Sequence, residues 1–186
     1  NNASKTALTW RKYLDEQYAN GIWNTNACPI VIRYAEVLLT YAEAVNELSG
    51  PSADVYDKLD LIRGRVGMPK VDREKYASKE TLRRLIRRER GVELAGEGVR
   101  RADILRWKDD NGKMVAETVL NGVLERVVGT VNYAETDPTK RAEIDTNAPV
   151  TDKKIEDRVF KVHNRYNPIP QGAIDNNPNL EQNPGY

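Results

Sequence analysis

The chain has 186 residues, and its 29 lysine and arginine residues are nearly balanced by 28 acidic residues, so the formal net charge is +1. This balance argues against a protein that binds nucleic acid or a membrane surface through bulk positive charge. The single cysteine, Cys28, and the single histidine, His163, exclude an internal disulfide, most zinc sites and a nucleophile built from one cysteine and two histidines.

Two helices are predicted to form a hairpin over residues 31–67. Apolar side chains step by three or four positions in residues 31–48, and a second stripe with the same period follows at about 53–66. Each segment ends at a glycine with a proline close behind, and proline cannot continue a helix. Because the connection is short, the two helices should pack antiparallel. In the first helix, we expect a core stripe of Tyr34, Leu38, Tyr41, Val45 and Leu48 and a solvated stripe of Glu36, Thr40, Glu43 and Glu47.

A long helix followed by a short one is predicted over residues 78–108. Ser78 is a suitable N-cap, helix-forming residues continue to about Glu97, and Gly98 then ends the long helix. The short helix follows at about 100–108. The apolar face of the long helix consists of Leu82, Leu85, Ile86 and Val92.

Three carboxylates lie on or beside that apolar face. Steps of about 100° per residue place Glu89 and Glu93 in its middle and Glu97 at its edge. A metal site in a helical bundle would need Glu-x-x-His pairs, which are absent from the sequence. An acid/base pair is a second possibility, but no nucleophile, oxyanion donor or cofactor motif accompanies it.

We favour a third interpretation, in which these carboxylates form structural ion pairs, because a buried carboxylate is costly unless it is paired. The forked guanidinium groups of arginine match carboxylates well. The candidate partners are Arg63, Arg65, Arg90, Arg100 and Arg101. We therefore predict no catalytic residue, no metal and no cofactor. The nine basic residues between Arg83 and Lys108 are interpreted as a solvated face rather than a nucleic-acid site.

The rest of the chain has weaker patterns. Residues 115–120 fit a short helix, residues 124–131 and 158–162 fit short strands, and residues 137–152 fit a loop. Three Asn-Pro steps in residues 165–186 predict an irregular strap rather than a regular element. Its expected anchors are Ile169, Ile174, Leu180 and Tyr186.

Nine tyrosines and three tryptophans contrast with a single phenylalanine. Aromatic faces with nearby polar groups suit the stacking of sugar rings, and they suit many protein interfaces equally well. Trp10 and Trp23 lie in an irregular stretch and are the candidate ligand-binding residues, with packing in the core as the alternative. Trp107, Tyr34 and Tyr41 lie on helical stripes and are expected to pack in the core.

Several segments resemble, in the same order, the C-terminal part of the SusD/RagB family of bacterial surface lipoproteins. They are RKYL at 11–14, PIVIRYAEVLLTYAEA at 29–44, IRGRVGMP at 62–69, the Glu89-Arg90 to Trp107 region, and the ending from Pro168-Ile169-Pro170-Gln171 to Asn183-Pro184-Gly185-Tyr186. Gly96, Arg101 and Ala173 depart from the family pattern. We expect residues 1–186 to be the C-terminal region of a longer protein.

The resemblance implies a mainly α fold, the SusD-like α/α superhelix of tetratricopeptide-like helix hairpins, with a few short strands and a long irregular C-terminal strap. It also implies a non-catalytic lipoprotein on the outer-membrane surface that captures oligosaccharides, or in some members peptides, for a SusC-like TonB-dependent transporter. The lipid anchor is expected on a part of the protein outside residues 1–186, and no membrane span is expected. The alternative function is a tetratricopeptide-like module that binds a protein partner without sugar.

Overall fold

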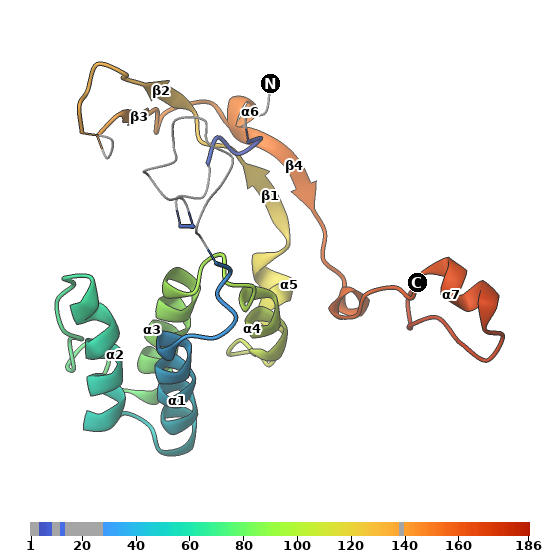
Figure 1. Ribbon diagram of the computed structural model, residues 1–186, viewed down its shortest axis with the longest axis horizontal. Helices are drawn as coiled ribbons and strands as arrows, with labels where there is room; N and C mark the ends of the chain where they lie inside the picture. The colour runs from blue at the N-terminus through green and yellow to red at the C-terminus, as the bar shows by residue number, and fades with distance from the viewer. Residues whose placement is uncertain (1–3, 9–11, 14–27, 138–139) are drawn as a thin grey trace. The chain divides into compact units, whose positions relative to one another are not determined.

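The computed structural model describes residues 4–8, 12–13, 28–137 and 140–186. The chain folds as two compact units. Helices account for 43% of the described residues and strands for 10% (Figure 1).

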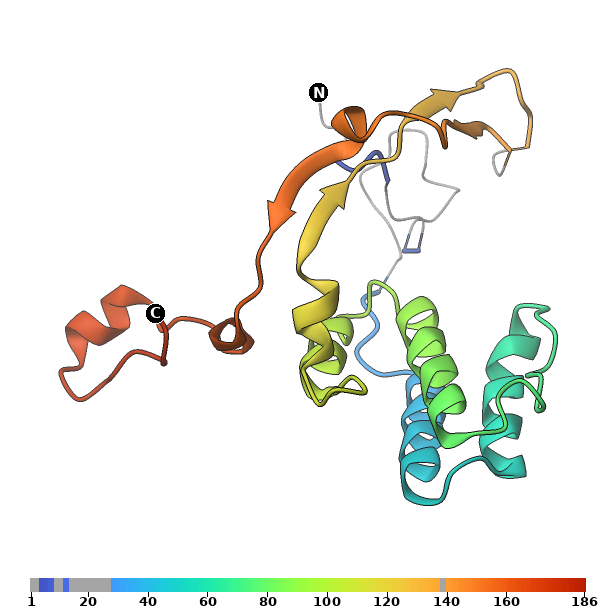
Figure 2. The same cartoon turned by 180° about the vertical axis from the view of Figure 1, so that it is seen from behind.

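The first unit, Trp10–Arg101, is built from α1 (Tyr34–Ser49), α2 (Ala53–Arg65) and α3 (Lys79–Glu93). α1 packs against both α2 and α3, as two opposite views show (Figures 1 and 2). The buried core of this unit consists of Leu38, Leu39, Ala42, Val55, Tyr56, Leu59, Ile62, Val71, Leu82, Leu85, Ile86 and Leu94. α1 thus forms the centre of the helical layer.

Local sequence explains where these helices begin and end. The Ser52 side chain accepts a hydrogen bond from the backbone of α2, and Ser78 forms a reciprocal capping box with Thr81 at the start of α3. α1 ends at Gly50, whose φ of 80° lies in the left-handed region that glycine adopts without strain. The short connection between α1 and α2 produces the expected hairpin.

The predicted core stripe of α1 is partly wrong. Tyr34, Tyr41 and Leu48 are exposed, at 71%, 45% and 85% of their surface. Glu43, expected in solvent, is buried instead. The helix carries apolar side chains around most of its circumference, so periodicity alone does not decide which of its faces meets α2 and α3.

The long helix also differs from its prediction at its end. α3 ends at Glu93 rather than near Glu97, because Gly96 adopts a φ of 78° and turns the chain two residues before Gly98. Val92 is 70% exposed, since it lies at the edge of the apolar face in the last turn.

The second unit combines Asn1–Thr9 with Ala102–Tyr186. Its helical part packs Ile104, Trp107, Met114 and Ala116 into a small core, with Phe160 partly buried against it. The elements are α4 (Arg100–Arg106), which crosses the boundary of the two units along the chain, α5 (Val115–Val119), α6 (Val150–Lys153), the 3-10 helix η2 (Val162–Arg165) and α7 (Gln171–Asn176).

Within the described residues, four strands form two separate antiparallel pairs. β1 (Gly122–Glu125) pairs with β4 (Lys154–Arg158), with Val123 opposite Asp157. β2 (Gly129–Val131) pairs with β3 (Ala142–Ile144), with Thr130 opposite Glu143.

Three predictions for this unit need correction. The strand expected at 158–162 lies earlier in the chain, as β4, and ends at Arg158 because it pairs only with the four-residue β1. Residues 162–165 form η2 instead. The expected loop at 137–152 contains β3 and begins α6. The strap at 165–186 contains α7, which starts directly after Pro170, a position where proline is compatible with a helix start.

Candidate functional site

The three carboxylates of the α3 region lie on the inner side of the helical unit. Arg33 stands directly before α1 and reaches two of them. Its Nη1 lies 2.6 Å from Glu93 Oε1, and its Nε lies 2.7 Å from Glu97 Oε2. The side chains of Glu93 and Glu97 are only 11% and 2% exposed, so Arg33 bridges two carboxylates that are largely removed from water.

Two further cations complete this cluster. Arg65 Nη2 donates to Glu93 Oε1 at 2.7 Å, and Lys12 donates to the carboxylate of Glu97. Lys12 Nζ also donates to the backbone oxygens of Glu93 and Ala95, both at 3.0 Å. Positive charge at the C-terminal end of a helix is favourable, because the last carbonyl groups carry partial negative charge. The cluster therefore neutralises the carboxylates and closes the end of α3.

Glu89 is held separately from the other two carboxylates. Arg63 Nη1 lies 2.5 Å from Glu89 Oε1, and Arg63 Nε donates to the backbone oxygen of Pro69 at 2.7 Å. This pair joins the end of α2 to the middle of α3. Glu89 and Glu93 are thus held by different arginines of α2, Arg63 and Arg65.

The structure places the other three candidate arginines elsewhere, and one of them, Arg101, is an exposed residue of α4. Arg90 is buried and faces α1, where its Nη1 donates to Thr40 at 3.0 Å and its Nε lies 3.8 Å from the buried carboxylate of Glu43. The guanidinium of Arg100 lies against Gly91, so that an added Cβ at Gly91 would be 3.3 Å from Arg100 Nη1. The pairing of Arg90 also explains why Glu43 is buried.

The ion-pair cluster shifts the pKa values of Glu97 and Arg33. Burial would raise the pKa of the Glu97 carboxyl, but hydrogen bonds from Arg33 and Lys12, together with their charges, hold it below its ordinary value of 4.5. The hydrogen bond to Glu97 raises the pKa of the Arg33 guanidinium, against the opposing effect of burial. Both groups therefore remain charged, which suits a structural ion pair rather than proton transfer.

Sequence reasoning missed Arg33 and Lys12 as partners. Both lie 60 or more residues from the carboxylates that they contact, and helical periodicity carries no information over that distance. One signal was present at Arg33, because a cation directly before a helix is unfavourable to the helix dipole and so needs another partner. Lys12 offered no comparable signal.

Metal chemistry finds no support in the described part of the chain. No group of three or more histidine, cysteine or acidic side chains among the described residues is arranged to hold a metal ion.

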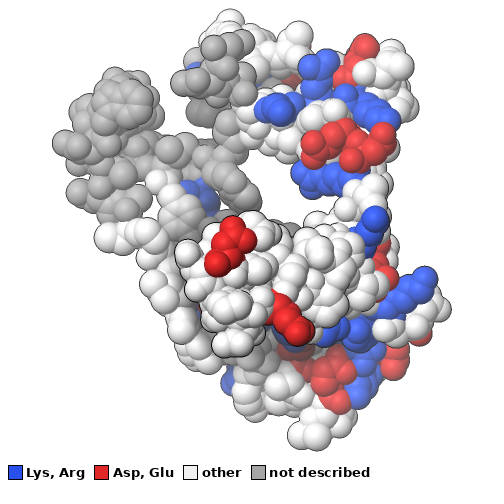
Figure 3. Space-filling view, turned by 90° about the vertical axis from the view of Figure 1, so that its right-hand side faces the viewer, with Lys and Arg blue, Asp and Glu red and all other residues white. Residues whose placement is uncertain are grey.

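None of the helices in the described part of the chain combines the length and apolarity required to cross a bilayer. Figure 3 shows basic and acidic side chains close together on the face that it presents.

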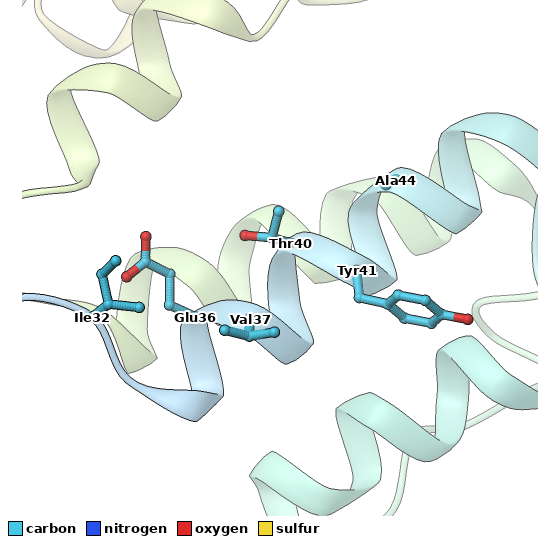
Figure 4. A pocket seen from close by; sticks show the side chains of 6 residues that line it. All are labelled: Ile32, Glu36, Val37, Thr40, Tyr41 and Ala44. Atoms are coloured by element: carbon cyan, nitrogen blue, oxygen red, sulfur yellow. The ribbon is translucent and has the colours of Figure 1, made fainter.

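Among the described residues, two apolar hollows flank α1. One, of about 360 Å³, lies on its outer face and is lined by Ile32, Glu36, Val37, Thr40, Tyr41 and Ala44 (Figure 4). The other, of about 400 Å³, lies between α1 and α2 and is lined by Arg33, Tyr34, Ala35, Leu38, Leu61, Ile62 and Arg65. Both hollows belong to the helical unit, and both expose aliphatic and tyrosine side chains.

A third hollow, of about 440 Å³, lies near the C-terminus and is lined by Val162, His163, Arg165, Tyr166, Pro184 and Gly185. The rings of His163 and Tyr186 meet edge to face, with their centroids 4.9 Å apart. The Tyr186 hydroxyl donates to the backbone oxygen of Tyr166 at 2.9 Å, so the end of the chain is fastened to η2 and the residue after it. His163 therefore has a packing role here.

Trp10 and Trp23, the candidate ligand-binding residues, lie outside the described residues. Trp107 is buried, as expected, and the exposed positions of Tyr34 and Tyr41 leave their rings on the outer surface of the helical unit.

Comparison with known proteins identifies a family whose model matches the whole chain and relatives that match parts of it. The model of the SusD family matches residues 1–186. SusD-like protein P25 from Formosa agariphila is 40% identical over 79 residues, which cover 42% of this chain and 15% of the relative. SusD-like protein P2 from the same organism is 38% identical over 93 residues, which cover 47% of this chain and 18% of the relative.

A solved structure of a SusD-like protein has a similar fold. The crystal structure of a SusD-like protein from Bacteroides fragilis is 28% identical and superposes with a TM-score of 0.62. The superposition covers 85% of this chain and 26% of that one. The chain therefore spans about a quarter of the solved relative and less than a fifth of the curated relatives. The resemblance noted in the sequence and the mainly α, SusD-like fold class are both confirmed.

Proposed function

Because the chain belongs to the SusD family, we propose that it is part of a surface protein that captures glycans and delivers them for import. The match of the family model to residues 1–186 is the observation that carries this proposal. In the proposed role, the full-length protein is a lipoprotein on the outer-membrane surface and hands oligosaccharides to a SusC-like TonB-dependent transporter. Residues 1–186 are its C-terminal region.

We propose a binding role without catalysis. The three glutamates that could have suggested acid/base chemistry are each engaged by arginine or lysine. A carboxylate with its pKa held down by such partners, as in Glu97, is a poor proton donor near neutral pH. This arrangement supports a protein that makes and breaks no covalent bond.

Trp10 and Trp23 remain the proposed sugar contacts within this chain. Indole rings stack on the apolar faces of sugars and leave the sugar hydroxyls to nearby polar groups. Loss of one stacking ring should weaken binding roughly tenfold.

The test is calorimetry of the full-length protein against oligosaccharides that a glycan array selects. We expect saturable binding that falls roughly tenfold in Trp10→Ala or Trp23→Ala. Tyr133→Ala is the matched control. Tyr133 lies in the loop between β2 and β3 and is 82% exposed, so loss of its ring should leave the affinity for the oligosaccharide unchanged. No saccharide binding at all would contradict the proposal, and unchanged affinity in both tryptophan variants would remove only the assignment of the contacts.

A protein-binding module without sugar recognition is the second candidate function. The exposed apolar outer face of α1 favours it, since such faces mark interaction surfaces. Tight binding of the full-length protein to a purified soluble protein, together with an array on which no saccharide is retained, would favour this candidate over glycan capture.

A further inference from the structure

The sequence contains three Asn-Gly steps, and two of them, Asn111-Gly112 and Asn121-Gly122, lie within the described residues. Such a step is chemically reactive, because glycine has no side chain to keep its backbone nitrogen away from the amide carbon of the asparagine before it. All four residues of the two steps are exposed. Access of water therefore does not distinguish the two steps, and the difference between them is in what holds each asparagine.

Asn121 is held by three hydrogen bonds. Its Nδ2 donates to the backbone oxygens of Glu117 at 2.7 Å and Phe160 at 3.2 Å, and its Oδ1 accepts from the Phe160 nitrogen at 2.6 Å. The next residue, Gly122, begins β1 and lies opposite Arg158 of β4. The side-chain amide of this step is therefore fixed by hydrogen bonds, and its backbone is fixed by a strand pair.

Asn111 is held much less firmly. Its side chain makes no hydrogen bond to any of the described residues, and its backbone nitrogen donates to Asp109 Oδ1 at 2.9 Å. Gly112 N donates to Asp109 O at 3.0 Å, so this bond must open before the nitrogen can react. Residues 110–113 are all exposed, and a surface turn opens at a lower free-energy cost than a paired strand.

We infer that Asn111 is a site of spontaneous deamidation and that Asn121 is protected from it. In the reaction, hydroxide removes the proton from Gly112 N, and this nitrogen attacks Asn111 Cγ to close a succinimide ring. The bond between Cγ and Nδ2 breaks, and ammonia leaves after taking a proton from water, which restores the hydroxide. Water then opens the ring at one of its two carbonyl groups and gives aspartate or isoaspartate. The inference does not depend on glycan binding.

The modification acts on the turn that joins α4 to α5. Trp107 O accepts from Val115 N at 3.0 Å across the base of this turn, and the buried side chains of Trp107 and Met114 belong to the small core of the second unit. Either product adds a negative charge beside Asp109 and Asp110, and isoaspartate also adds a methylene group to the main chain. Deamidation at this site therefore changes the connection that closes the small core.

Peptide mapping of the full-length protein tests the inference. The folded protein is incubated at mildly alkaline pH, where hydroxide is more abundant, and circular dichroism establishes that it stays folded. Trypsin cuts after Lys108, Lys113 and Arg126, so the two steps fall on separate peptides, 109–113 and 114–126. Mass spectrometry then measures the conversion of amide to carboxylate in each peptide over time. A parallel incubation in urea measures the same two steps in the unfolded chain.

We expect Asn111 to deamidate roughly tenfold faster than Asn121 in the folded protein, because the hydrogen bonds and the strand pair at Asn121 must open first. In urea the two rates should agree within about threefold, because both steps are then Asn-Gly in a disordered chain. Equal rates in the folded protein, or faster conversion of Asn121, would overturn the inference. A ratio of rates that urea leaves unchanged would also overturn it, because the structure would then not protect Asn121.

Asn111→Gln is the matched variant. The longer side chain keeps the amide but would have to close a larger and less favourable ring, so conversion in peptide 109–113 should be lost while Asn121 reacts at its parent rate. Conversion of peptide 109–113 that persists in this variant would contradict the assignment to Asn111, since glutamine would then be the only amide side chain in that peptide.

Discussion

α1 and α3 pack against each other in one helical unit, yet they are stabilised in different ways. α3 turns Arg84 and Arg88 to solvent and begins with a capping box at Ser78. α1 turns Val37 and Leu48 outward and begins at Arg33 without a side-chain cap. α3 satisfies its own start and its own outer surface, whereas the start and the outer surface of α1 depend on partners elsewhere.

This difference separates what is local from what is tertiary. Capping and a charged outer face are encoded within about 15 residues of α3, so they are present whatever surrounds the helix. The start of α1 is fixed by the contacts of Arg33 with Glu93 and Glu97, about 60 residues away in sequence. α1 is therefore the element whose stability should be most sensitive to distant changes.

The largest effect is expected from Arg33→Ala. The substitution leaves the carboxylates of Glu93 and Glu97, which are 11% and 2% exposed, without their shared guanidinium. Removal of one partner from a buried ion pair typically costs about 3–5 kcal/mol. Because Arg65 and Lys12 still contact Glu93 and Glu97, we expect the free energy of unfolding to fall by about 3 kcal/mol, at the lower end of that range. Urea titration of the full-length protein measures the loss.

Arg65→Ala is the control for that experiment. Arg65 also pairs with Glu93, but its side chain is 58% exposed, and exposed ion pairs contribute at most about 1 kcal/mol. A loss in Arg33→Ala no larger than that in Arg65→Ala would mean that α1 does not depend on its distant partner in the way proposed here.

The next effect compares the outer surfaces of the two helices. Leu48→Ala removes a side chain from the apolar outer face of α1, and stacked tetratricopeptide-like hairpins cover such faces, so we expect a cost of about 2–3 kcal/mol in the full-length protein. Val92→Ala removes an aliphatic side chain of α3 that should remain in solvent, at a cost within about 0.5 kcal/mol. Both values come from urea titration of the full-length protein. Equal small losses would mean that Leu48 is as exposed to solvent as Val92 in the full-length protein.

The sequence predicted α3 better than α1, for the same physical reason. Ser78 as N-cap and the inward position of Leu82, Leu85 and Ile86 follow from local periodicity, and the structure contains both. Tyr34, Tyr41 and Leu48 were expected inside because α1 is apolar on more than one side, and periodicity cannot choose between two apolar faces. The error at α1 is thus itself a mark of its apolar outer surface.

The candidate site divides in a similar way. Helical spacing predicted that three glutamates of the α3 region would face inward and need cations. Of the five arginines proposed as partners, Arg63 and Arg65 contact these carboxylates. Helical spacing could not supply Arg33 or Lys12, because nothing local links a residue before α1 with the end of α3. The short strands and α7 were also poorly anticipated, since elements of three to six residues depend on their tertiary partners more than on propensity.

Acid sensitivity should follow from the ion pairs of both helices. Hydrogen bonds from Arg83 hold the pKa of the Glu47 carboxyl below its ordinary value of 4.5. Arg33 and Lys12 do the same for the pKa of Glu97, although burial of that carboxyl acts to raise it. A folded-state pKa below the unfolded value means that the unfolded chain binds protons more readily. This stabilisation is therefore fully present above about pH 4.5 and is lost as the pH falls through the folded-state pKa values.

Glu97→Gln and Glu47→Gln measure the two contributions. Each variant should be less stable than the parent at neutral pH, and its free energy of unfolding should fall less steeply below pH 4.5, where the parent loses the same interaction. Urea titrations at several pH values test this expectation. Parallel curves for parent and variants would show that neither carboxylate contributes to the acid transition.

The smallest expected effect concerns the start of α3, where its independence from the rest of the chain is encoded. Ser78 Oγ accepts from Thr81 N at 3.1 Å, and Thr81 Oγ1 accepts from Ser78 N at 3.2 Å, so two free backbone donors are satisfied reciprocally. Ser78→Ala removes one of these bonds and should lower the free energy of unfolding by about 1 kcal/mol.

Ser52→Ala at the start of α2 should cost less than Ser78→Ala, because its bond from Val55 N is longer, at 3.4 Å, and has no reciprocal partner at N3. Hydrogen exchange of the first turn of each helix reads the two losses separately. The first turn of α1 has no side-chain cap. If it opened as readily in the parent protein as the first turn of α3 opens in Ser78→Ala, the contacts of Arg33 would not be acting in place of a cap. Slower opening of α1 would show that an ion pair 60 residues away in sequence can hold a helix start as firmly as a local hydrogen bond.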